Sequence, residues 1–227
     1  MKTKFKKVIS FLLMFTLVFL NFQGITFAET EITYGTVRVI VRNNTFKTED
    51  GAKWDGLLLD KEVSLNSESN VLSSISDAVK SSGYSITGAD TGYVTEINGL
   101  NEMDGGIKSG FNISLNDWML NAAGTQFKTA DGSLSDGDEI CIEYSCAWGA
   151  DIGSMWDKND TSLSNLTFSD GVLSETFSSG VKNYTLTVGS DVDKIKVTPS
   201  AVNRNFQARI YKNEYKPENP GIKSNLP

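Results

Sequence analysis

The stretch that decides the fold class is residues 69–83, which read SNVLSSISDAVKSSG. Its apolar side chains recur at the spacing of one helical face. They are Val71, Leu72, Ile75, Ala78 and Val79. Ser69 or Asn70 can cap the first turn, and Gly83 can end the helix in a left-handed conformation. Lys80 lies in the last turn, where the helix dipole favours a cation. The stretch predicts an amphipathic helix that packs on a sheet.

Strand patterns surround this helix. In residues 36–42 the valines at 37, 39 and 41 share one face and Arg38 and Arg42 the other, as in a half-buried strand. Leu57, Leu59, Val63 and Leu65 are expected to alternate in a second strand. Further short strands are predicted at residues 84–87, 93–97, 110–115, 118–121 and 139–145. Residues 29–157 are therefore predicted to form an α+β domain, a mixed β-sheet with one main helix.

The pattern changes after Asp157. Residues 158–162 are short and polar, as expected of a linker. Residues 163–227 show only strand patterns, at 163–168, 184–188 and 194–198, which predicts an all-β Ig-like sandwich. Such a sandwich needs about seven strands over about 80 to 100 residues. We therefore expect this second domain to be truncated, with a proline-containing tail (residues 216–227) that adds no strand.

Residues 1–28 have the order of a secretory signal peptide. Lys2, Lys4, Lys6 and Lys7 precede an apolar run from Val8 to Leu20, and small residues flank Phe27 before a cleavage point after Ala28. The alternative is a retained membrane anchor. Cleavage would remove four lysines and no acid, changing the net charge from −7 to −11. The expected protein is secreted or held at the cell surface, with no transmembrane span after cleavage and no nucleic-acid partner.

The composition argues against catalysis. The chain has no histidine, the commonest general base and zinc ligand. We find no nucleophile elbow, phosphate-cradling loop or metal-ligand spacing, so we expect no enzyme activity, no metal site and no cofactor. The acidic stretch 131–139 is interpreted as a solvated turn that leads into a strand. A weak calcium site is the alternative, although the oxygen-ligand spacing of a calcium loop is missing.

Two cysteines, Cys141 and Cys146, leave the redox state open. Export would permit a disulfide. Five steps along a continuous strand, however, span about 16 Å and place the two side chains on opposite faces. Unbridged thiols are the main expectation, and a disulfide that needs a bend after Tyr144 is the alternative.

Tryptophan placement suggests a ligand surface. Trp54, Trp118, Trp148 and Trp156 each lie beside an acid, a small residue or a turn. An aromatic face beside a hydrogen-bonding group suits a sugar or another ring-shaped ligand. The candidate ligand-binding residues, in order, are Trp118 and Trp148, with Phe111 and Asp151 as neighbours. The alternative is that the indoles close a small core.

Residues 33–156 also resemble a domain of unknown function related to the C-terminal domain of transcobalamin. The resemblance rests on Val37-Arg38-Val39, on the helix start at 69–72 and on residues 93–100, which read YVTEINGL. It continues through Ser109-Gly110-Phe111, residues 115–118 (LNDW) and residues 136–140 (DGDEI). The Ile97-Asn98-Gly99 and Asn116-Asp117-Trp118 signals are its most specific parts.

Residues 163 onward look like the cadherin-like β-sandwich domain of bacterial surface proteins. This resemblance rests on residues 163–168 (LSNLTF), on Gly171-Val172-Leu173, on Phe177-Ser178 and on residues 184–188 (YTLTV). The pairing of the two domains is similar to that in surface proteins of Gram-positive anaerobes.

The resemblances imply a non-enzymatic binding or adhesion module, with a small molecule or glycan as ligand, carried on a β-sandwich spacer and associated with the cell wall. In transcobalamins the related domain covers the upper side of cobalamin, so a cobalamin or corrinoid half-site, or a cap, is one alternative. An accessory part of a larger polysaccharide-associated surface enzyme is another.

Overall fold

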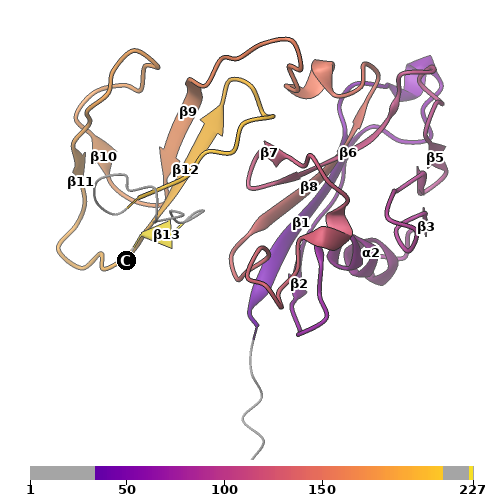
Figure 1. The fold of residues 1–227 in the computed structure, drawn as a ribbon, viewed down its shortest axis with the longest axis horizontal. Coiled ribbons are helices and arrows are strands. Elements are labelled where there is room, and N and C mark those ends of the chain that lie inside the picture. Colours follow the sequence, from indigo (N-terminus) through magenta and orange to yellow (C-terminus); the bar gives the residue numbers. More distant parts are fainter. Residues whose placement is uncertain (1–33, 212–224, 227) are drawn as a thin grey trace, which may run out of the picture. The chain divides into compact units, whose positions relative to one another are not determined.

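A computed structural model describes residues 34–211 and 225–226. The predicted signal peptide lies outside the described residues. The described part consists mostly of β-strands in several sheets, with one α-helix, α2 (Val71–Ser81) (Figure 1). The β-rich fold with a single helix is confirmed. Within the described residues, no helix has the length and apolar character needed to cross a membrane.

The largest sheet has five strands in the order β2-β1-β8-β6-β7 (Figure 1). Their bounds are β1 Thr36–Asn43, β2 Gly56–Ser64, β6 Gly110–Leu115, β7 Trp118–Met119 and β8 Glu139–Ser145. β1 runs parallel to β8, and every other neighbouring pair is antiparallel. The sheet is therefore mixed, as expected.

Helix α2 begins and ends where its sequence predicts. Asn70 forms a reciprocal capping box, because its Oδ1 accepts from Ser73 N (3.0 Å) while Asn70 N donates to Ser73 Oγ (2.9 Å). Gly83 follows with φ +83°, the left-handed conformation that ends the helix. The apolar face of α2 joins Val37, Val39 and Val41 of β1 in one buried cluster. The helix therefore covers one face of the sheet.

One sequence expectation in β2 is wrong. β2 carries a bulge, because Val41 pairs with Leu59 and Arg42 pairs with Leu57, which leaves Leu58 as an extra residue. The bulge reverses the alternation, so Leu57 is exposed although Leu59 is buried. Alternation in the sequence alone could not reveal this extra residue.

A second, smaller sheet follows the helix in the sequence. It has the order β3-β4-β5, from strands Ile86–Thr87, Glu96–Ile97 and Leu100–Asn101. Asn98 and Gly99 join β4 to β5 with φ values of 49° and 80°, and Asn116 and Asp117 join β6 to β7 with 51° and 68°. Positive φ at both positions is typical of a type I′ hairpin.

The remaining strands follow residue 162. β9 (Leu163–Phe168) pairs antiparallel with β12 (Ile195–Ala201), and β10 (Val172–Leu173) pairs with β11 (Leu186–Thr187). β13 (Asn225–Leu226) pairs with the other edge of β12. The expectation that the tail adds no strand is therefore wrong. Three short 3-10 helices, η1 (Thr48–Asp50), η2 (Gly124–Gln126) and η3 (Ala150–Ile152), complete the described elements.

Candidate functional site

Two of the aromatic candidates contribute to packing. Phe111 on β6 is buried, and its ring meets Tyr144 edge-on at a centroid distance of 5.1 Å. Trp118 on β7 is half-buried, with its ring edge-on to Phe127 at 5.6 Å. Its indole Nε1 donates to Asn205 O at 3.2 Å. Trp118 therefore offers little free ring face to a ligand.

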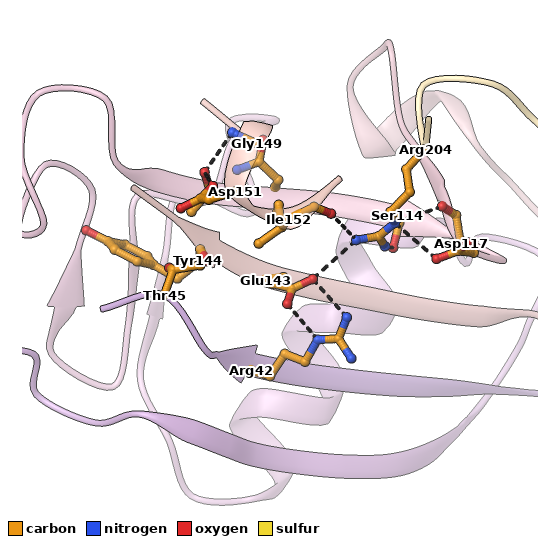
Figure 2. A network of polar contacts seen from close by, with 12 residues as sticks. Arg42, Thr45, Ser114, Asp117, Glu143, Tyr144, Gly149, Asp151, Ile152 and Arg204 are labelled. Atoms are coloured by element: carbon orange, nitrogen blue, oxygen red, sulfur yellow. Dashed lines mark hydrogen bonds and ion pairs between the residues drawn. The ribbon is translucent and has the colours of Figure 1, made fainter. Parts of the chain in front are cut away.

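The other two candidates lie in the loop after β8. Trp148 is exposed, and Lys108 Nζ lies 5.1 Å from its ring centroid, so a cation covers one ring face. Asp151 accepts hydrogen bonds from Ser145 Oγ and from Cys146 N (2.7 Å). The Asp151 carboxylate therefore closes its own loop (Figure 2).

A groove of about 340 Å³ runs beside the free edge of β6. β7 pairs only with Ser114 and Leu115, so residues 110–113 have β8 on one side and the groove on the other. Just after β7, Leu120 N makes one further backbone bond to β6 by donating to Ile113 O at 2.9 Å. Ile113 and Leu120 are among its apolar lining residues, and Asn112 and Asn121 are among its polar ones.

Two exposed aromatic rings line this groove. Tyr93 is 48% exposed and Trp156 is 69% exposed. A Cβ at Gly110 would lie 2.9 Å from the Tyr93 hydroxyl, so glycine at 110 permits this close approach. Burial raises the pKa of Tyr93, and the neighbouring Glu102 raises it further. Tyr93 is therefore neutral, with its hydroxyl close to Gly110 and about half of the residue exposed to solvent.

Sequence reasoning only partly identified this pair. Trp156 is one of the four tryptophans with suitable neighbours, but its local sequence does not set it above Trp118 or Trp148 as a ligand residue. Tyr93 belongs to the stretch 93–100 on which the transcobalamin-like resemblance rests, but nothing in its local sequence indicates ligand binding. The two residues are 63 positions apart, and no local pattern brings them together.

A larger groove of about 550 Å³ lies along α2. It is lined mainly by hydroxyl and charged side chains, among them Ser73, Asp77, Lys80 and Thr87. It lacks an aromatic residue in its lining, so it offers no platform on which a ring could stack. The β6 groove is therefore the better candidate site despite its smaller volume.

The sheet face away from α2 carries a polar network (Figure 2). The Glu143 side chain, 7% exposed, lies between two guanidinium groups: its Oε1 is 2.9 Å from Arg42 Nε and its Oε2 is 3.3 Å from Arg204 Nη1. Arg204 comes from the loop after β12. It also donates to Ser114 Oγ (Nη2, 2.8 Å) and to Ile152 O (Nη1, 2.8 Å).

Asp117 in the β6–β7 turn completes the network, with its Oδ1 3.0 Å from Arg204 Nε. Burial raises the pKa of Asp117, and the Arg204 charge opposes that rise. Every charged member has an opposite charge within reach, so the network stabilises the sheet face and is a poor candidate for general acid or base chemistry.

The acidic stretch 131–139 organises turns. Asp131 Oδ1 accepts from Ser133 N at 2.9 Å, and Asp138 Oδ1 accepts from Asn116 Nδ2 at 2.6 Å. Asp136 Oδ1 accepts from Thr36 N at 2.8 Å. In the described part of the chain, no three acidic, cysteine or histidine side chains gather as a metal site would require.

Cys141 and Cys146 are both free thiols in the structure. Cys141 is buried in β8, and burial raises its pKa to about 11, so its thiol is protonated at neutral pH. Cys146 lies beyond the strand end, half-buried, with Sγ 3.8 Å from Thr45 Oγ1.

These environments predict stepwise labelling without reductant. Iodoacetamide at pH 8 should modify Cys146 in the folded protein and reach Cys141 only after denaturation, because Cys146 is partly exposed whereas Cys141 is buried and its pKa is raised. Intact-mass spectrometry should show one added label and then two. If neither cysteine takes a label before a reductant is added, the two form a disulfide and our assignment is wrong.

Comparison of the chain with protein families, with curated proteins and with solved structures found no match.

Proposed function

We propose that this chain is a secreted or cell-surface, non-enzymatic binding module that holds a glycan or another ring-shaped small molecule in the β6 groove. The observation that carries the proposal is the pair of exposed rings, Tyr93 and Trp156, lining one groove. Stacking on such rings supplies affinity, and the neighbouring Asn112 and Asn121 amides can orient hydroxyl groups. The signal-like residues 1–28 support export.

The resemblances in the sequence support the same role. A transcobalamin C-terminal-like region over residues 29–157 would present the groove, and a cadherin-like region would follow it. A corrinoid is a flat ring far larger than one sugar, so a groove of about 340 Å³ would contact only part of it. A corrinoid half-site is therefore the second outcome that a binding experiment should test.

The test is equilibrium binding of the mature full-length protein to a glycan array and to cyanocobalamin. Alanine at Trp156 or Tyr93 should weaken binding of the selected ligand by about 1–3 kcal/mol, the loss typical of an aromatic anchor. Trp148→Ala is the matched control, because this exposed tryptophan does not line the groove.

Three outcomes are informative. Selective loss in the Trp156 and Tyr93 variants with a glycan supports the proposal, and the same loss with cyanocobalamin alone assigns a corrinoid site. Equal affinity in the Trp156 variant and the wild type, or loss only in the Trp148 variant, would place the ligand elsewhere. Either result would refute the β6 groove as the binding site.

A further inference from the structure

The turn that carries Trp156 is held by one distant side chain. Residues 153–162 contain no helix or strand, and Lys158 N donates to Met155 O at 3.3 Å across the turn. The Asn203 amide closes this turn from outside. Its Nδ2 donates to Met155 O and to Lys158 O, both at 2.8 Å, and its Oδ1 accepts from Met155 N at 3.2 Å.

The Asn203 side chain has no hydrogen-bonding capacity to spare. Its Oδ1 also accepts from Asn205 N at 3.1 Å, so two donated and two accepted bonds use both amide hydrogens and both oxygen lone pairs. Asn203 is 1% exposed. A buried amide that loses these partners leaves backbone groups of the 155–158 turn unsatisfied, which is costly.

The segment that carries Asn203 is also bonded to Met119 on β7, which lines the same groove. Arg204 O accepts from Met119 N at 2.7 Å, and Arg204 N donates to Gly153 O at 3.0 Å. Asn205 Oδ1 accepts from Ser154 Oγ at 2.8 Å. Met119 lines the groove, as does Trp156. Residues 203–205 therefore connect two parts of the groove lining that are otherwise far apart in the sequence.

We infer that residues 203–205 position Trp156 in the β6 groove, with Asn203 as the main positioning residue. Residues beyond 162 are then part of the binding unit and do more than act as a spacer. The role in binding rests on the proposed function, whereas the positioning of Trp156 does not.

The positioning can be measured without a ligand. The full-length protein is labelled with 5-fluorotryptophan, and the four fluorine resonances are assigned with Trp→Phe variants. In Asn203→Ala the Trp156 resonance should shift and narrow as the turn loosens. The Trp54 resonance should stay in place, because Trp54 is buried in the core with its Nε1 bonded to Ile97 O.

A second variant and a matched control separate positioning from general damage. Asn203→Asp keeps the two acceptor functions, removes the two donors to Met155 O and Lys158 O and sets a carboxylate oxygen against these two carbonyl oxygens, so it should still displace the Trp156 resonance. Asn165→Ala removes an exposed asparagine on β9 and should leave all four resonances unchanged. A Trp156 resonance unchanged in both Asn203 variants overturns the inference.

The link to binding is tested with a β-1,4-linked N-acetylglucosamine hexasaccharide, or with the best ligand of the glycan array if that sugar does not bind. Asn203→Asp should weaken binding about tenfold, close to the effect of Trp156→Ala. Wild-type affinity in Asn203→Asp together with lost affinity in Trp156→Ala would refute a role of Asn203 in binding. Absence of any ligand would refute the proposed function, while the fluorine spectra would still test whether Asn203 positions Trp156.

Discussion

Replacement of Arg204 by alanine is expected to lower the free energy of unfolding by about 3 kcal/mol, at the lower end of the loss for a broken buried ion pair. The side chains of Arg204 and Glu143 are only 12% and 7% exposed. Without the guanidinium, Asp117 loses its nearest cation, and Glu143 keeps only Arg42. Ser114 Oγ and Ile152 O also lose a donor. Equilibrium urea unfolding followed by circular dichroism measures the change.

Arg38 provides the matched control. It forms the same number of ion pairs with carboxylates, at 2.6 Å to Asp60 and 2.8 Å to Glu139, but its side chain is 46% exposed. Solvent screens such pairs, so Arg38→Ala should cost no more than about 1 kcal/mol. If the two arginine variants lose equal stability, burial is not what makes the Arg204 network important.

The second large effect is expected at Tyr144. Its ring is fully buried against Phe111 and Phe46, so Tyr144→Ala should lower the free energy of unfolding by about 3–5 kcal/mol through lost burial and a new cavity. The hydroxyl donates to Asn101 O at 2.8 Å and accepts from Gly105 N at 3.1 Å. Tyr144→Phe keeps the ring but removes these two bonds and the buried contact between the hydroxyl and Ser109 Oγ (2.8 Å). Asn101 O and Gly105 N keep other partners, so the expected loss is that of the hydrogen bonds themselves, about 1–2 kcal/mol.

Tyr184 provides a control that tests whether burial determines the stability lost when a tyrosine hydroxyl is removed. Its hydroxyl likewise donates to one backbone carbonyl, Ser178 O (2.8 Å), and accepts from one backbone amide, Ser178 N (2.7 Å). Those groups are open to solvent, so water can replace the hydroxyl, and Tyr184→Phe should cost less than about 1 kcal/mol. Chemical denaturation of the two Phe variants under one condition gives the comparison. A larger loss at Tyr184 than at Tyr144 would contradict the argument.

The elements that the sequence predicted well are those whose signals are local. Three such elements are the α2 cap at Asn70, the end of the helix at Gly83 and the valine face of β1. Each depends on residues only a few positions away in the sequence. The strands around β4, β7 and β11 were predicted too long. Their ends depend on which neighbour pairs with them, and β7 finds partners only at Ser114 and Leu115.

The sequence by itself determined a β-rich chain with one capped amphipathic helix, because helix caps, turn residues and periodicity act over a few neighbouring residues. Only the tertiary structure brought Tyr93 and Trp156 to one groove and placed Asn203 on the Trp156 turn. It alone set Arg204 against Glu143, 61 positions away. Such contacts depend on the path of the whole chain, and a buried asparagine or arginine has the same letter in the sequence as an exposed one.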